Sequence, residues 1–157
     1  MKFLADAMLG KLARWLRMLG HDVVYSAELE DSELLELAKK EERVLLTKDL
    51  ELYRRAVGKG LDAYYVEGKT EPDRLAEVAK RYSLSLEIDM DKSHCPICNT
   101  KLAPAPKEQL QTELQKNTYT HYDKFWKCPS CSQIYWQGAH WKQITQTLTQ
   151  ARQKLCL

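Results

Sequence analysis

The sequence predicts an α/β fold: a doubly wound parallel sheet, followed by a small zinc ribbon and a C-terminal helix. Short apolar runs alternate with amphipathic segments through residues 1–90, which is the pattern of parallel sheets with right-handed crossovers. Two Cys-x-x-Cys pairs follow within residues 91–157, and the end of the chain returns to helical spacing. We therefore expect two parts, residues 1–90 and residues 91–157, that pack against each other.

The first twenty residues set the pattern for the rest of the chain. Residues 3–5 form a short apolar run that Asp6 ends, and apolar side chains then recur at helical spacing from Met8 until Gly20 ends the helix. A strand this short and apolar is typical of a buried parallel sheet. Asp6 then lies at the carboxyl end of the strand, where open α/β sheets bind ligands. The alternative is that Asp6 only caps the helix.

Four further strands and three further helices are expected before residue 90. The strands are predicted at residues 23–25, 43–47, 62–66 and 84–88. The helices are predicted at residues 32–41, at about ten residues that end near Gly58, and from the Thr70 cap to Tyr82. Asp31 is the expected N-cap of the first of these helices.

Three carboxylates follow three of the predicted strands. Asp6, Asp31 and Asp49 all fall in strand-to-helix turns, and in a parallel sheet these turns share one edge. Crowded carboxylates repel one another and are held together by a cation, and Mg²⁺ or Mn²⁺ prefers such oxygen ligands. An ion of this kind activates water for attack on a phosphodiester. The sequence therefore predicts a catalytic metal site at this edge.

Glu33 is the expected source of a fourth oxygen, and Glu67 and Asp73 are weaker candidates. The alternative assigns only structural roles to these acids: Asp31 as a cap, Asp49 as a turn residue and Glu33 as part of a solvated helix face.

The cysteines predict a second metal site of a different kind. Cys95 and Cys98 form one Cys-x-x-Cys pair and Cys128 and Cys131 the other, with 29 residues between the pairs. Four thiolates complete a tetrahedral site with no open position, as in structural zinc sites. Redox-active cysteines or an iron site remain the alternatives. Cys156 is left over as a free thiol.

Charge is distributed unevenly along the chain. Residues 1–90 contain 15 Lys and Arg against 18 Asp and Glu, a net charge of −3, whereas residues 91–157 contain 9 against 4, a net of +5. A basic segment suits a polyanionic partner, and its aromatic residues suit base stacking. The alternative is that Tyr135 and Trp136 form the core of the ribbon. The side chains expected to contact the phosphates of such a partner are Arg14, Arg17, Lys48, Lys101, Lys124 and Lys127.

No apolar run approaches the roughly 18 residues that a membrane span requires. The N-terminal segment also lacks the pattern of a signal peptide, since Asp6 and Lys11 interrupt its apolar stretch. We therefore expect a cytoplasmic protein with no membrane contact.

Several segments together resemble a PIN-like ribonuclease family that also forms the C-terminal domain of mutator-class exonucleases. The matching segments are FLADAMLGKLARWLRMLGHDVVY, DSELLELA, VLLTKD, CPICN, FWKCPSC and YWQGAH. Members of this family carry a zinc ribbon after the PIN-like part. The resemblance implies a metal-dependent ribonuclease in which Asp6, Asp31 and Asp49 match the acidic positions. The last motif often has Ser before its His, whereas this chain has Ala139.

These observations predict a Mg²⁺- or Mn²⁺-dependent ribonuclease that hydrolyses RNA phosphodiester bonds and uses its zinc ribbon to bind RNA. Transfer RNA and ribosomal RNA are candidate substrates. Two alternatives stay open: a non-catalytic adaptor that binds RNA or the ribosome, and a toxin-like nuclease that a partner protein controls.

Overall fold

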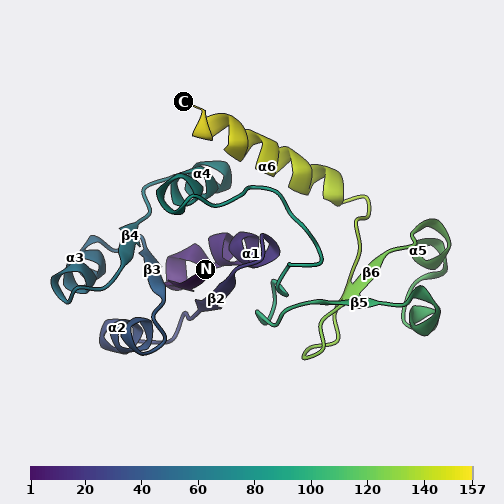
Figure 1. The fold of residues 1–157 in the computed structure, drawn as a ribbon, viewed down its shortest axis with the longest axis horizontal. Helices are drawn as coiled ribbons and strands as arrows, with labels where there is room; N and C mark the ends of the chain where they lie inside the picture. Colours follow the sequence, from purple (N-terminus) through teal and green to yellow (C-terminus); the bar gives the residue numbers. More distant parts are fainter. Residues whose placement is uncertain (157) are drawn as a thin grey trace.

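Strands and helices alternate through the first half of the chain (Figure 1). The computed structural model describes residues 1–156. One sheet consists of four parallel strands in the order β2-β1-β3-β4: β1 (Lys2–Ala5), β2 (Asp22–Tyr25), β3 (Val44–Thr47) and β4 (Ala63–Tyr65). The connecting elements are the 3-10 helix η1 (Ala7–Leu9) and the helices α1 (Gly10–Met18), α2 (Asp31–Lys40), α3 (Leu50–Gly58) and α4 (Glu71–Tyr82).

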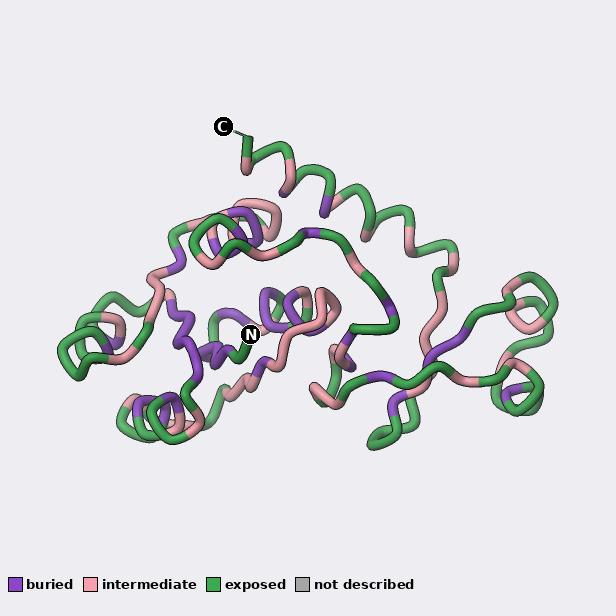
Figure 2. The backbone as a smooth tube through the Cα atoms, viewed as in Figure 1, coloured by how far each residue is buried: buried purple, intermediate pink, exposed green. Residues whose placement is uncertain are grey.

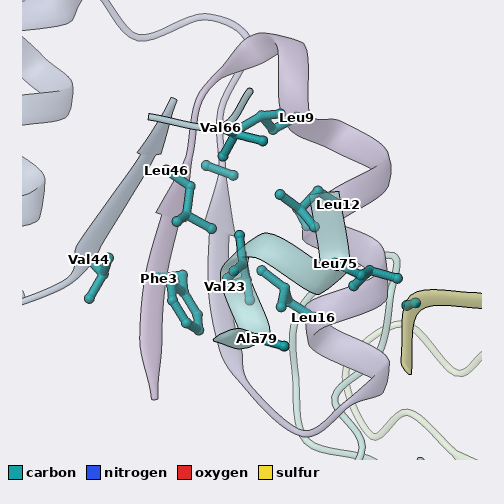
Figure 3. Close-up of a cluster of buried hydrophobic side chains, with 14 of the residues drawn as sticks. Phe3, Leu9, Leu12, Leu16, Val23, Val44, Leu46, Val66, Leu75 and Ala79 are labelled. Carbon is teal, nitrogen blue, oxygen red and sulfur yellow. The ribbon is translucent and has the colours of Figure 1, made fainter. Parts of the chain in front are cut away.

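Helices cover both faces of this sheet. Side chains alternate along β1, so Phe3 and Ala5 pack with α1 and α4, whereas Leu4 packs with α2 and α3. Figure 3 shows the first of these layers, with Leu12 and Leu16 of α1 facing the strands. Full burial of one such leucine contributes about 1.5–3 kcal/mol. The predicted α/β class and parallel sheet are confirmed.

The fifth strand predicted at residues 84–88 is absent from the described part of the chain. Leu86 is buried, Leu84 and Ile88 are half-buried, and all three pack against the α1–α4 layer. Their alternation reflects one buried side of an extended segment that pairs with no strand. The Leu86 carbonyl instead accepts a hydrogen bond from Arg152 Nη1 at 2.8 Å.

The second part begins with a three-stranded antiparallel ribbon. Its strands, in the order β5-β6-β7, are β5 (Ala103–Ala105), β6 (Phe125–Lys127) and β7 (Ile134–Tyr135). The 3-10 helix η2 (Lys107–Leu110) and the short helix α5 (Lys116–His121) lie between β5 and β6. A small cluster that includes Cys95, Leu102 and Trp126 forms the core of the ribbon.

The last helix, α6 (Trp141–Leu155), returns from the ribbon to α4 (Figure 1). Leu148 and Ala151 are buried in the same cluster as α1 and α4, and most of the remaining α6 surface is exposed (Figure 2). Lys154 Nζ lies 2.7 Å from Asp73 Oδ1 of α4. Although the sequence assigns α6 to the second part, α6 completes the core of the first.

The first cysteine pair is attached to β2, the edge strand of the parallel sheet. An edge strand presents unpaired backbone groups. Here Val23 N donates to Asn99 Oδ1 at 2.8 Å, and Arg17 Nε donates to Val23 O at 2.9 Å. Arg17 Nη1 also donates to Pro96 O at 2.8 Å. Arg17 and Asn99 therefore join the ribbon to the sheet, and they give hydrogen-bond partners to the backbone C=O and N–H of Val23 at this edge.

Asp22 extends this junction into the sheet. Its Oδ1 lies 2.7 Å from Asn99 Nδ2 and 2.9 Å from Arg43 Nη1. Partial burial disfavours the charged carboxylate, but the hydrogen bonds from Arg43 and Asn99 outweigh it and lower the pKa of Asp22.

Replacing Arg17 should destabilise the protein far more than replacing Arg14 on the same helix. Arg17→Leu leaves the Val23 and Pro96 carbonyls without their charged donor, which costs about 1.5–3 kcal/mol or more. Arg14 is exposed, so Arg14→Leu should change the free energy of unfolding by about 0.5 kcal/mol at most. Denaturant unfolding of both variants measures the difference. Equal effects would show that the junction adds no stability.

The junction should also make stability sensitive to acid. Because the pKa of Asp22 is lower in the folded protein than in the unfolded chain, its stabilisation is fully present above the ordinary value of about 3.9 and is lost as the pH falls further. Unfolding of wild type and Asp22→Asn should be compared at pH 6 and at pH 3. The variant should be less stable at pH 6, and the difference should shrink at pH 3. A difference that does not change with pH would contradict this role.

Candidate active site and zinc site

The carboxyl ends of β1 and β3 bring Asp6 and Asp49 together around the Thr47 hydroxyl. The two strands are neighbours, and Asp6 N donates to Leu46 O at 3.2 Å. Thr47 is fully buried, and its Oγ1 donates a hydrogen bond to Asp6 Oδ2. The same oxygen accepts a hydrogen bond from Asp49 N at 2.9 Å. One buried hydroxyl thus fixes a carboxylate from one strand end against the backbone of the next.

Both carboxylates also cap the elements that follow them. Asp6 is only 7% exposed, and its Oδ1 accepts a hydrogen bond from Met8 N at 3.2 Å at the start of η1. Asp49 Oδ1 accepts from Glu51 N at 2.9 Å and from Leu52 N at 3.2 Å at the start of α3. The capping role considered for Asp6 is therefore confirmed, and capping fixes the direction of each side chain at the sheet edge.

Asp31 does not cap α2, contrary to the sequence prediction. The N-cap is Glu30, and Glu30 and Glu33 form a capping box in which Glu33 Oε1 accepts from Glu30 N at 3.2 Å. Glutamates at both ends of the box satisfy the backbone groups that Asp31 was expected to satisfy. Asp31 Oδ2 instead lies 3.7 Å from Arg55 Nη1 of α3. Glu33 thus has a structural role, and the Asp31 carboxylate has none in the cap.

The acidic side chains do not form a tight cluster in this structure. Among residues 1–156, the only group of three or more potential ligand atoms that lie within 4.8 Å of one another is the cysteine set. Mg²⁺ commonly binds through one or two carboxylates and keeps several waters. Asp6 and Asp49 offer two carboxylates at adjacent strand ends, whereas one oxygen of Asp31 lies beside Arg55.

Glu71 is an acid of this edge that the sequence analysis missed. It is the first residue of α4, just after β4, and its Oε1 lies 3.2 Å from Arg74 Nη1. Its Oε2 is buried and has no hydrogen-bond partner in the described part of the chain. An unpaired buried oxygen is costly unless a ligand satisfies it. In sequence Glu71 is one of several acids in a helix start, so no local signal singles it out.

The two weaker acidic candidates differ from Glu71. The Asp73 carboxylate accepts from Thr70 Oγ1 at 2.7 Å and pairs with Lys154. The hydrogen bond from Lys154, followed by that from Thr70, lowers the pKa of Asp73. Asp73 therefore joins α6 to α4. For Glu67, the structure shows a backbone contact: Glu67 N donates to Glu77 Oε1 at 2.7 Å.

Hydrogen bonds to Gly68 hold the loop after β4 at the acidic edge of the sheet. Gly68 N donates to Glu77 Oε2 at 2.6 Å, and Gly68 O accepts from Lys48 Nζ at 3.2 Å and from Arg74 Nε at 2.9 Å. A Cβ on Gly68 would lie 2.6 Å from Glu77 Oε2, so no larger residue fits without a shift. In Figure 3, Val66 at the start of this loop lies beside Leu9 of η1. Lys48 is thereby held next to Asp49.

The two cysteine pairs form matching turns. In the first, Asn99 N donates to Cys95 O at 2.8 Å and Cys95 N to Thr100 O at 2.7 Å. In the second, Ser132 N donates to Cys128 O and Cys128 N to Gln133 O, both at 2.9 Å. Asn99 and Ser132, which directly follow the second cysteine of each pair, both have positive φ, at 73° and 66°. Each turn therefore aims its two thiols to the same side.

The thiols fit a tetrahedral zinc site. Cys95 Sγ lies 3.7 Å from Cys131 Sγ, and Cys98 Sγ lies 3.3 Å from Cys128 Sγ. Zn–S bonds of about 2.3 Å place tetrahedral sulfurs about 3.8 Å apart, whereas a disulfide requires about 2 Å. Hydrogen bonding with Thr100 lowers the pKa of Cys98 to about 6. Four cysteines positioned for a metal confirm the predicted cluster.

The side chains predicted to contact RNA divide into three groups. Arg17 is buried and donates hydrogen bonds to two carbonyls, so the prediction that it contacts RNA is wrong. Its position on the helix suggested a solvent-facing side chain, but the ribbon covers it. Lys127 Nζ pairs with Glu113 at 3.2 Å, and Lys48 is held by Gly68. The remaining three are exposed and form no ion pair within residues 1–156: Arg14, Lys101 and Lys124.

Loss of the metal should unfold the ribbon. Metal-binding energy in such sites is folding energy, so Cys128→Ser should abolish zinc binding and the ordered structure around β6 and β7. Cys156→Ser is the matched control, since Cys156 lies outside the cluster. Metal analysis and amide hydrogen exchange measure the two effects. A wild-type protein purified without metal, or with Cys95 and Cys98 joined in a disulfide, would contradict the assignment.

No helix within residues 1–156 has the length and apolar character needed to cross a membrane. Neither curated proteins nor solved structures include a match to this chain. A family model, the Mut7-C RNAse domain, matches residues 1–148 and so covers both the acidic edge and the cysteine cluster. The chain therefore belongs to the family of Mut7-C RNase domains.

Proposed function

We propose that this protein is a metal-dependent ribonuclease whose active site is the acidic edge of the parallel sheet. The observation that carries the proposal is the fixed arrangement of Asp6 and Asp49 on adjacent strand ends around Thr47. Membership of an RNase family supports RNA as the substrate. Open α/β sheets bind ligands at the carboxyl ends of their parallel strands, which is where these two carboxylates lie.

Asp6 and Asp49 would hold Mg²⁺ or Mn²⁺, with Glu71 as the added acid and Asp31 joining after it leaves Arg55. When bound, such an ion supplies an activated water and offsets the charge that develops on the attacked phosphate. The protein contributes position: Thr47 and the η1 backbone hold Asp6 in one orientation, and the α3 backbone holds Asp49. Lys48, which precedes Asp49, and the exposed Arg14 of α1 would supply cationic groups for RNA phosphates.

A non-catalytic adaptor is the second candidate because the acidic side chains form no tight cluster within residues 1–156, whereas the ribbon has exposed lysines for RNA. An adaptor would bind RNA through Lys101 and Lys124 and would not depend on Asp49.

Removing one acidic charge should abolish cleavage without unfolding the protein. Asp49→Asn is the cleanest test, because Asn caps a helix as well as Asp does and α3 should stay intact. Cleavage of a labelled single-stranded RNA with Mn²⁺ should fall roughly 100-fold or more, the scale expected when a charge-stabilising group is lost. Asp6→Asn should behave in the same way.

Asp123→Asn is the control, since Asp123 is exposed on the ribbon and pairs with Lys107. It should cleave like wild type, and all samples should be inactive when no divalent ion is present. Equal cleavage by Asp49→Asn and wild type would reveal a contaminating nuclease and refute the assignment. RNA binding without cleavage by wild type would favour the adaptor.

A further inference from the structure

We propose that an aromatic pocket between the ribbon, α1 and α6 binds one nucleobase of single-stranded RNA, away from the acidic edge. This inference rests on the proposal that RNA is the substrate. The pocket has a volume of about 200 Å³, and it is lined by the end of α1, by the segment 90–102 around the first cysteine pair, and by residues from β7 into α6. Met18 comes from the end of α1, Trp136 follows β7, and Trp141 opens α6.

The two tryptophans that line this pocket have indole N–H groups that are free to donate a hydrogen bond. Trp136 and Trp141 are both half-buried, and neither indole N–H has a hydrogen-bond partner within residues 1–156. By contrast, the buried Trp126 donates from Nε1 to Asp91 at 3.0 Å. Among residues 1–156, neither pocket indole nitrogen is a buried atom without a partner, so both N–H groups reach solvent and can donate to a ligand. The His140 ring packs edge-on against Trp136, with centroids 6.5 Å apart.

The zinc site fixes one wall of the pocket. The Tyr135 hydroxyl lies 3.1 Å from Cys95 Sγ, so a cysteine of the cluster holds the Tyr135 ring. Tyr135 packs with the ribbon core, as considered from the sequence, and it also lines the pocket beside Trp136. The position of the aromatic wall therefore depends on the folded ribbon.

Size and charge favour a nucleobase as the occupant. Pockets for drug-sized ligands occupy about 300–1,000 Å³, so this smaller pocket suits a single ring system. No Asp or Glu lines it, and residues 91–157, which supply every lining residue except Met18 and Met90, carry a net charge of +5. Base stacking on aromatic rings flanked by cations is how single strands are bound without sequence preference.

The pocket lies at the opposite end of α1 from Asp6. Nine residues of α1 separate the two ends, about 12 Å at the rise of an α-helix. A base in the pocket therefore belongs to a nucleotide distant from the scissile bond. It contributes to substrate affinity and leaves the chemical step unchanged.

The test measures binding of an eight-nucleotide oligoadenylate without added Mg²⁺ or Mn²⁺, with tryptophan fluorescence as a readout. Binding should quench wild-type fluorescence, and Trp136→Leu and Trp141→Leu should each raise Kd roughly 5- to 100-fold, the range for loss of one base–aromatic stack. Trp136→Phe should restore most of the affinity. Trp15→Phe is the control and should bind like wild type, because Trp15 of α1 packs against the first core and does not line the pocket.

Gly138→Ala provides a second variant that adds atoms instead of removing a ring. Its Cβ would lie 2.6 Å from Trp136 Nε1, so the indole has to turn and Kd should rise. Zinc content and the unfolding midpoint should match wild type in every variant used. With Mn²⁺ added, the tryptophan variants should show a raised KM and an unchanged kcat.

An unchanged Kd in both leucine variants, or wild-type binding without quenching, would overturn the proposal that the pocket binds a nucleobase. A lowered kcat with unchanged KM would also overturn it. If wild type binds and quenches but cleaves no RNA, the pocket stands and the proposed ribonuclease activity fails. If the oligoadenylate does not bind at all while a labelled RNA is cleaved, the pocket fails and the activity stands.

Discussion

The burial of β1 is the constraint on which the rest of the molecule depends. Phe3, Leu4 and Ala5 are fully buried, and β1 pairs with β2 on one side and β3 on the other. A strand with neighbours on both sides and helices on both faces has a single register that satisfies its backbone. Both crossovers then have to leave at the same edge. That edge brings Asp6 and Asp49 to adjacent positions, although 42 residues lie between them in the chain.

Local sequence patterns predicted the four paired strands and their helices because each is encoded within a dozen residues. Apolar runs such as residues 44–46 are buried on both faces and need no distant partner to be recognised. The same holds for Thr70, whose side chain caps α4 as expected. The cysteine cluster was predictable because two rigid turns of fixed spacing determine it.

Most of the errors arise where a distant segment decides the outcome, and one arises between close neighbours in the chain. Helical spacing places Arg17 off the apolar stripe of α1, but Pro96, 79 residues later, supplies its partner. Residues 84–88 alternate like a strand, yet α6 and α4 decide what covers them. Asp31 has the chemistry of a cap, and Glu30 takes that position through a capping box with Glu33. The buried Glu71 oxygen depends on packing that no local pattern encodes.

The return of α6 to the first core changes how the two parts of the chain are related. The ribbon is enclosed between α4 and α6, and both of these helices belong to the α/β core. In topological terms the ribbon is an insertion between two helices of the α/β core. If the ribbon unfolded, α4 and α6 would still hold its two ends together. The entropic cost of closing such a loop rises only slowly with its length. The insert is nevertheless part of the core, because Arg17 and Val23 take hydrogen-bond partners from Pro96 and Asn99.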